Sequence, residues 1–242
     1  MEVEELGKTK ISVVIPVYNE KNTLLEILRR VKEVNIPKEI ILVDDFSTDG
    51  TRDVLKQINE ENIKVIFQPR NFGKGFALRT GFKQVTGDIV IIQDADLEYD
   101  PNDYYNLIQP IINGKADIVY GTRFPRKKGH PSIVRPYFSL INPFYFANKI
   151  LTLMTNFLYR TNITDEPTCY KVFKTEILRD INLKCMRFEF CPEVTAKVRK
   201  KGYKIHEVPI EYNPRSIKEG KKINWKDGIE AIWTLIKYRF ND

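Results

Sequence analysis

The sequence predicts an α/β fold in which a mostly parallel β-sheet is covered by helices on both faces, and two observations carry that prediction. In the first half, short apolar and β-branched segments alternate with helical segments, the order that produces parallel strands. Several of the short segments, such as residues 40–43 and 89–92, are apolar throughout, as expected of strands buried on both faces. A length of 242 residues fits one generous domain, or one domain with an appendage.

The predicted elements of the first half follow one another in regular order. Strands are expected at residues 11–16, 39–43, 63–67, 88–93 and 117–120, where Val and Ile recur. Helices are expected between them at residues 23–34, 51–59, 76–85 and 103–113. Asp49 and Thr51 could cap the second of these helices, and Asn102 or Asp103 could cap the fourth.

The second half begins with a basic segment. No acidic residue occurs between Asp117 and Asp165, and this stretch holds seven basic residues, Arg123, Arg126, Lys127, Lys128, Arg135, Lys149 and Arg160. Because the whole chain has 39 basic and 32 acidic residues, this one segment accounts for the entire net charge of +7. Phosphates or acidic lipids are the partners expected there, and a solvated basic face is the alternative.

Two amphipathic helices are expected in this half, at residues 147–159 and 225–240, with a short α+β portion between them that extends to residue 209. Both helices are rich in apolar and aromatic residues, and the second is flanked by Lys226, Lys237 and Arg239. Each could pack on the core. Together they are also typical of helices that lie on a membrane surface.

Composition excludes several classes of protein. The three cysteines lack Cys-x-x-Cys spacing, so neither a disulfide framework nor a zinc site is indicated. Two histidines are too few for a multi-histidine metal site, so oxygen atoms must ligate any metal. The first ten residues are polar, and nowhere do about 18 uncharged apolar residues occur in a row. A soluble or peripheral cytoplasmic protein is therefore expected.

Polar side chains gather where three of the predicted strands end. They lie at residues 16–20, 44–51 and 94–98, and ligands of parallel sheets bind at this edge. Helix capping does not explain Asp94 and Asp96, which directly follow a buried strand. With Glu98 they suit a hard divalent cation that also binds the phosphates of a ligand.

Other phosphate-binding and hydrolytic motifs are absent. No Gly-x-Gly-x-x-Gly follows the first strand, no complete P-loop occurs, and there is no Gly-x-Ser-x-Gly elbow. The sequence Gly73-Lys74-Gly75 follows the third strand and has the wrong spacing for a dinucleotide-binding loop. Dinucleotide-dependent enzymes, P-loop NTPases and serine hydrolases are therefore not supported.

Three motifs occur in order along the chain, IPVYNE at residues 15–20, VDDFSTDGT at 43–51 and DADLE at 94–98. Together they resemble the family 2 glycosyltransferases, which have the GT-A fold. Further matches are GTR at 121–123, TD at 164–165, TCYK at 168–171, EVPI at 207–210, and Arg215 with Lys221. These resemble the dolichol-phosphate mannose synthases and related polyprenyl-phosphate glycosyltransferases. The resemblance covers about residues 10 to 230.

The resemblance implies a set of site residues. The base and ribose of a nucleotide sugar would be bound by Pro16, Tyr18, Glu20, Val43 and Asp45. Asp94 and Ala95 would line the donor site, and Asp96 and Glu98 would ligate Mg²⁺ or Mn²⁺. Arg123 would bind the diphosphate or, with Arg135 as a weaker candidate, the acceptor phosphate. Arg215 and Lys221 would close over the phosphates and complete a catalytic set with Asp94, Asp96 and Arg123.

Two features depart from the family pattern. Glu98 stands where many relatives carry Gln or Ser, and the membrane helices that many relatives carry at the carboxyl end are not found in this sequence. The expected organisation is a GT-A catalytic domain at residues 1–222, with a nucleotide-sugar half at 10–122 and an acceptor half that faces the membrane at 123–222. Residues 223–242 would form a C-terminal amphipathic helix.

The resemblance implies a metal-dependent inverting glycosyltransferase that moves a hexose onto dolichyl or another polyprenyl phosphate. Mannose from GDP-mannose is the expected donor, and UDP-glucose or another UDP-sugar is the alternative. The sequence is also compatible with a transferase that builds a soluble glycan, or with an inactive membrane-associated scaffold. Because an acceptor phosphate is already an anionic nucleophile, the reaction requires no strong general base.

The expected partners follow from this reaction. They are the nucleotide sugar, the polyprenyl phosphate and a membrane surface, with a small membrane-anchoring subunit as a further candidate and no nucleic acid. The expected location is peripheral, at the cytoplasmic face of a membrane.

Overall fold

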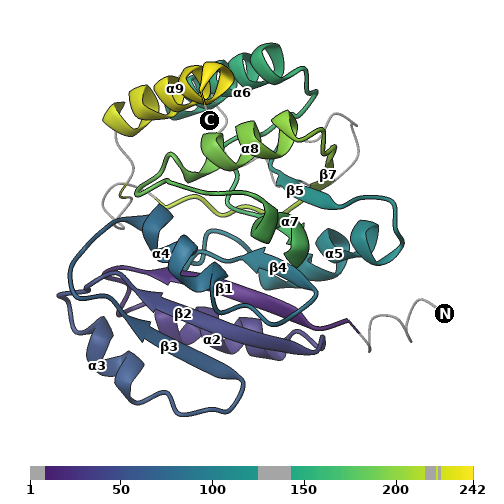
Figure 1. Ribbon diagram of the computed structural model, residues 1–242. Helices are drawn as coiled ribbons and strands as arrows, with labels where there is room; N and C mark the ends of the chain where they lie inside the picture. Colours follow the sequence, from purple (N-terminus) through teal and green to yellow (C-terminus); the bar gives the residue numbers. More distant parts are fainter. Residues whose placement is uncertain (1–8, 125–142, 216–221, 223–224, 242) are drawn as a thin grey trace.

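A computed structural model describes residues 9–124, 143–215, 222 and 225–241 of the chain (Figure 1). Seven strands form one sheet in the order β3-β2-β1-β4-β6-β5-β7. Their bounds are β1 Ile11–Val17, β2 Lys38–Asp44, β3 Ile63–Phe67, β4 Ile89–Ile92, β5 Ile118–Thr122, β6 Lys171–Lys174 and β7 Ile205–Pro209. The sheet, with helices packed on it, confirms the α/β class that the sequence predicts.

The strands of the first half pair as their order in the chain suggests. Parallel pairing joins β1 to both β2 and β4, and β2 to β3, so the carboxyl ends of these four strands share one edge. The strand β6 runs antiparallel to β4 and β5, and β7 returns parallel to β5. The sheet is therefore mixed, with its parallel part formed mainly by the predicted strands.

Helices cover the sheet, and further helices stack beyond it on one side. They are α2 Leu24–Glu33, α3 Thr51–Lys56, α4 Lys74–Phe82, α5 Tyr104–Ile112, α6 Pro143–Tyr159, α7 Thr175–Asp180, α8 Phe190–Lys200 and α9 Trp225–Phe240, with a 3₁₀ turn at Pro101–Asp103. The predicted helices of the first half are all present, although their ends differ by up to three residues. The helix α9 has the predicted bounds, and α6 begins four residues earlier than predicted.

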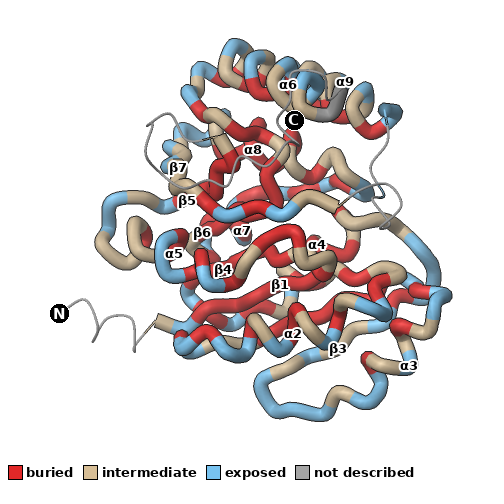
Figure 2. The backbone as a smooth tube through the Cα atoms, turned by 180° about the vertical axis from the view of Figure 1, so that it is seen from behind, coloured by how far each residue is buried: buried red, intermediate tan, exposed pale blue. Residues whose placement is uncertain are grey.

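The two amphipathic helices form a layer of their own. In Figure 1, α6 and α9 lie side by side above α8, on the far side of the molecule from α2 and α3. Their facing sides and α8 make a small second core, formed by Leu151, Tyr159, Ala196, Ala231, Leu235 and Tyr238. Figure 2 shows that burial is concentrated in the sheet and α8, while much of α6 and α9 is exposed or partly exposed.

No helix within the described part of the chain has the length and hydropathy of a bilayer-spanning segment.

Candidate active site

A cavity of about 1300 Å³ extends from the carboxyl ends of β1, β2 and β4 to the layer formed by α6 and α9. The wall of this cavity contains most of the predicted site residues, namely Pro16, Tyr18, Glu20, Asp45, Asp94, Ala95, Asp96, Glu98, Arg123 and Arg215. The three acidic clusters that the sequence placed at separate strand ends therefore meet in one site.

The backbone at these strand ends adopts an unusual conformation. Asn19, Phe46 and Leu97 have φ angles of 51°, 65° and 64°, in the left-handed region that residues other than glycine seldom occupy. They follow β1, β2 and β4, respectively. The first two loops fix each other, because Ser47 Oγ accepts the Asn19 amide N–H at 2.9 Å and Asn19 Oδ1 accepts the Thr48 N–H at 2.8 Å. Backbone strain of this kind is typical of functional sites.

Asp94 and Asp96 are each paired with a cation from another part of the chain. Lys74, the first residue of α4, places its Nζ 2.6 Å from Asp94 Oδ1, and Arg215 Nη2 lies 3.2 Å from Asp96 Oδ2. Burial and the negative charges of Asp94 and Glu98 raise the pKa of Asp96 to about 7. The charges of Asp94 and Glu98 therefore act on Asp96, and more positive charge there would stabilise its ionised form.

Glu98 is fixed by the segment that follows β7. Its carboxylate accepts the Tyr212 hydroxyl at 2.8 Å and the Arg215 backbone N–H at 2.7 Å. The Arg215 guanidinium then reaches across the cavity to Glu20, with both nitrogen–oxygen distances at 3.0 Å. This segment therefore joins the end of β1 to the Asp94–Glu98 turn.

Glu20 and Asp45 occupy the end of the cavity nearest β1 and β2. Lys222 Nζ donates to Glu20 Oε1 at 2.7 Å, and hydrogen bonds from Arg215 and Lys222 overcome the effect of burial to lower the pKa of Glu20. Asp45 accepts the backbone N–H groups of Phe72 and Gly73 at 2.8 and 2.7 Å. Asp45 therefore anchors the loop that leads into α4.

Arg123 is held differently from Arg215. Its guanidinium forms two bonds to Asp165, Nε to Oδ2 and Nη2 to Oδ1, each at 2.7 Å, and both side chains are buried. The ring of Tyr212 lies 4.9 Å from its guanidinium carbon. Arg123 lines the cavity, but Asp165 already balances its charge.

Three predicted residues are not seen in this wall. Val43 is fully buried in β2, where its side chain lies beneath Gly81 of α4, so it belongs to the core. Lys221 and Arg135 lie outside the described residues.

Other residues of the wall were not predicted as site residues. They include Asn71, Gly73, Lys74 and Lys222. The sequence signal for Lys74 was the Gly73-Lys74-Gly75 run, which does not fit a dinucleotide-binding loop but here starts α4 beside Asp94. Lys222 directly follows the predicted Lys221 and contacts Glu20 and the backbone carbonyl of Tyr18.

The carboxylates suit a divalent cation that is shared with a ligand. Among the described residues, no three Asp, Glu, His or Cys side chains converge as a ready-made metal site. Mg²⁺ commonly takes only one or two protein carboxylates and completes its shell with substrate phosphates and water. Asp96 and Glu98 offer such oxygen ligands, and the raised pKa of Asp96 marks a place where a cation is favourable. The residues present therefore fit the predicted metal.

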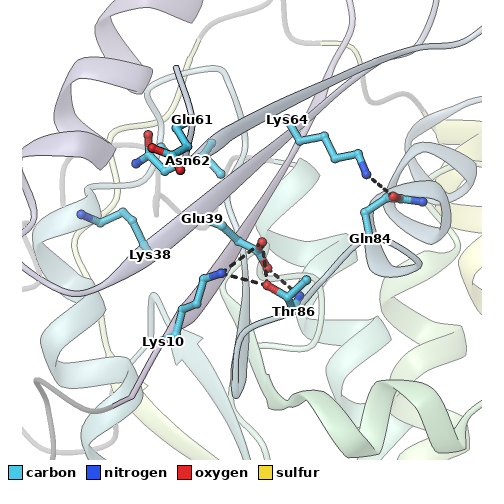
Figure 3. A pocket seen from close by; sticks show the side chains of 9 residues that line it. Lys10, Lys38, Glu39, Glu61, Asn62, Lys64, Gln84 and Thr86 are labelled. Carbon is cyan, nitrogen blue, oxygen red and sulfur yellow. Dashed lines mark hydrogen bonds and ion pairs between the residues drawn. The ribbon is translucent and has the colours of Figure 1, made fainter. Parts of the chain in front are cut away.

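A second hollow, of about 550 Å³, lies at the opposite, amino-terminal ends of β1, β2 and β3 (Figure 3). Its charged groups largely pair with one another or with neighbouring polar groups. Lys10 Nζ lies 2.9 Å from Thr86 Oγ1 and 3.5 Å from Glu39 Oε2, and Lys64 bonds to Gln84. This hollow lacks the concentration of acidic side chains found at the other end of the strands.

Known proteins with similar sequences are found among archaea. Over 97% of its length the chain is 30% identical to MJ1222, an uncharacterized protein of Methanocaldococcus jannaschii, and it covers 94% of that protein. It is 28% identical to the low-salt glycan biosynthesis hexosyltransferase Agl6 of Haloferax volcanii, over 85% of this chain and 48% of that one. It is 29% identical to the dolichol-phosphate mannosyltransferase of Pyrococcus furiosus, over 88% of this chain and 59% of that one. The chain thus spans about half to three fifths of the two relatives with named activities.

Solved structures with the same fold include glucosyl-3-phosphoglycerate synthase from Mycobacterium tuberculosis. The TM-score is 0.74 at 19% identity, over 100% of this chain and 86% of that one. Crystals of that enzyme have been obtained with UDP and either Mn²⁺ or Mg²⁺. At this level of identity the likeness concerns the fold, which is GT-A.

The sequence model described as glycosyl transferase family 2 matches residues 12–181, a span that runs from β1 through α7 and includes the three acidic strand ends. Because that span is well over half of the chain, this protein belongs to glycosyl transferase family 2 and has the GT-A fold.

Proposed function

We propose that this family 2 glycosyltransferase is a metal-dependent, inverting hexosyltransferase that moves mannose from GDP-mannose onto dolichyl or another polyprenyl phosphate at a membrane surface. One observation carries the proposal. The cavity that contains the carboxylates and Arg215 extends without interruption to α6 and α9, whose outer sides expose large apolar residues. A polar donor site beside an exposed apolar surface is what a lipid-phosphate acceptor requires.

The donor would occupy the end of the cavity formed by the strand ends. Tyr18 offers a ring face to the base, and Glu20 and Asp45 offer carboxylates to base N–H groups and ribose hydroxyls. Arg215 and Lys222 already meet at Glu20, so their side chains lie where a diphosphate would pass. Lys74 beside Asp94 adds a third cation to that region.

Asp96 and Glu98 would hold Mg²⁺ or Mn²⁺. The ion would neutralise charge on the diphosphate as it leaves the sugar. Support comes from the crowded carboxylates and from the metal-bound crystals of the fold relative described above.

The chain's own residues would do the remaining work by orientation and charge. The acceptor phosphate is an anionic nucleophile, so no side chain has to remove a proton from it. Attack from the face opposite the leaving diphosphate inverts the anomeric centre. Arg215 and Lys74 would stabilise the diphosphate as negative charge develops on it, and cationic groups fixed in this way contribute a large share of many rate enhancements.

The helices α6 and α9 would contact the membrane. Phe146, Leu153 and Phe157 on α6 and Trp225, Ile229, Trp233 and Phe240 on α9 are exposed. Basic side chains accompany them, including Lys149 on α6 and Lys226 on α9. An apolar surface with a basic rim binds bilayers that contain anionic lipid. The protein would then be peripheral at the cytoplasmic face, either alone or with a small anchoring subunit.

A transfer assay tests the proposal. The full chain is incubated with a polyprenyl phosphate in detergent, Mg²⁺ or Mn²⁺, and labelled GDP-mannose, UDP-glucose or UDP-N-acetylglucosamine in separate reactions. We expect label from GDP-mannose in the lipid extract, none after addition of a chelator, and very little with Asp96→Asn. A lipid product formed from a UDP-sugar alone would contradict GDP-mannose as the donor. The absence of a lipid product with every donor would contradict a polyprenyl phosphate as the acceptor.

A further inference from the structure

The end of the cavity farthest from the strand ends is apolar and lies between two helices. Side chains of α6 and α9 form this end, Ala147, Ile150 and Leu151 from α6 and Trp225, Ile229 and Ile232 from α9. The two helices pack against each other through the second core, farther along α9 at Leu235 and Tyr238. The apolar end of the cavity therefore lies between the amino-terminal halves of α6 and α9.

Some of these side chains belong to the cavity and to the outer surface at once. Ile150, Ile229 and Trp225 line the cavity and are 39%, 58% and 71% exposed. Phe157 and Trp233 lie on the same two helices and are more than 60% exposed, but they do not line the cavity. The cavity thus opens directly onto the exposed apolar face of the α6 and α9 layer.

A glycine leaves room within this opening. Gly228, in the first turns of α9, lines the cavity, and a Cβ atom built on it would meet no atom of the described residues within 4 Å. Its φ angle is an ordinary helical one, so neither backbone conformation nor packing requires glycine there. Glycine inside a helix lowers its stability relative to alanine, so the space that it leaves is the benefit to be explained.

We propose that the polyprenyl chain of the acceptor lies in this opening, between α6 and α9 and against Gly228, while its phosphate extends toward Lys74 and Arg215. This inference rests on the proposed function and names the path by which the lipid enters. An acceptor with an anionic head and an apolar tail matches a cavity that has cations at one end and aliphatic side chains at the other. The acceptor would reach the site sideways from the membrane, without leaving it.

A size series at Gly228 tests the path. Gly228→Ala, Gly228→Leu and Gly228→Phe add increasing volume to open space, and each new residue favours the helix more than glycine does, so folding should be preserved. We expect the KM for a long-chain polyprenyl phosphate to rise with the size of the side chain, by about tenfold for leucine. The KM for the nucleotide sugar and the flotation of the protein with vesicles should stay as in the wild type.

Ala147→Leu tests the same opening from α6 and should raise the KM for the acceptor in the same way. The inference is wrong if Gly228→Phe and Ala147→Leu use the polyprenyl phosphate as well as the wild type, or if both lose nucleotide binding to the same degree as acceptor use. Failure of the proposed function looks different, because the unmodified protein would then form no lipid-linked product at all.

Discussion

The two arginines that line the cavity are held in different ways. Arg123 is buried, and both of its bonds to Asp165 join it to a carboxylate that is fully buried as well. Arg215 divides its guanidinium between Glu20 and Asp96 and stays partly exposed. An arginine with one buried partner is fixed, whereas one shared between two carboxylates can exchange them for a diphosphate. We therefore expect Arg123 to stabilise the fold and Arg215 to act on the substrate.

Asp165→Ala tests the role of Arg123. The substitution leaves a guanidinium buried without its partner, so we expect the free energy of unfolding to fall by about 3 to 5 kcal/mol. Chemical denaturation followed by circular dichroism measures the change. Glu33→Ala is the matched control, since Glu33 pairs with Arg29 on the exposed side of α2 and its loss should leave the free energy of unfolding almost unchanged. Equal effects of the two substitutions would show that the Arg123 pair does not support the fold.

For individual residues, residue type and position in the sequence predicted the site only in part. Asp94, Asp96 and Glu98 could be placed because they directly follow a buried strand, and that position fixes where their backbone lies. Lys74 could not be placed, because its contact with Asp94 joins residues that are 20 positions apart on different elements. Local sequence does not encode such pairings, which depend on how α4 is set against β4.

Among the elements, those with a strong local pattern were predicted and the others were not. The helix α9 and the strand β3 have the predicted bounds, since apolar residues recur at helical spacing in α9 and β-branched residues predominate in β3. The strand β6, only four residues long, lies in the portion that was predicted as α+β without bounds for its elements. Its sequence, Lys-Val-Phe-Lys, is short and flanked by charge, and both of its neighbours, β4 and β5, precede it in the chain. Tertiary pairing rather than propensity defines this strand.

The start of α5 offers a test of how pH affects stability. Asp103 is buried next to the segment after β7, where it accepts the Glu211 N–H at 2.9 Å, and burial raises its pKa to about 7 from a value of 3.8. The folded state therefore binds the proton more strongly than the unfolded state does. The stability that this raised pKa of Asp103 contributes is complete below pH 3.8 and is lost as the pH rises through 7.

We therefore expect the free energy of unfolding to fall between pH 5 and pH 8, by on the order of 2 kcal/mol from this group. Asp103→Asn keeps an oxygen for the Glu211 N–H and cannot ionise, so it should remove this part of the pH dependence. Urea denaturation of both proteins at pH 5, 6, 7 and 8 gives the comparison. Parallel curves for the two proteins would contradict the pKa assigned to Asp103.

Across the whole molecule, acidic and apolar surfaces lie at opposite ends of one cavity. The parallel strands β1, β2 and β4 bring the acidic loops to one edge, and the segment after β7 crosses back to them through Tyr212 and Arg215. On the far side of the cavity, α6 and α9 pack on α8 with their outer faces uncovered by any described residue. On a bilayer, as the proposed function requires, this arrangement would orient the molecule with the cavity opening toward the membrane.

The proposed orientation predicts which surface residues would contact the membrane. Phe157 and Trp233 are 84% and 63% exposed on α6 and α9, and neither lines the cavity. Burying these two side chains in a bilayer would contribute about 1.5 to 3 kcal/mol each, so replacing both with Gln should weaken binding to vesicles containing anionic lipid by at least about tenfold. Flotation of the full chain with such vesicles, at low and high salt, measures this.

The matched control is Leu25→Gln. Leu25 is 58% exposed, but it lies on α2, at the opposite end of the molecule from α6 and α9 (Figure 1). If membrane binding depended on exposed apolar residues in general, this substitution would weaken flotation as well. We expect no change, because a bilayer that contacts α6 and α9 cannot reach α2. Loss of flotation with Leu25→Gln, or retention with the Phe157 and Trp233 double substitution, would assign the membrane contact to another surface.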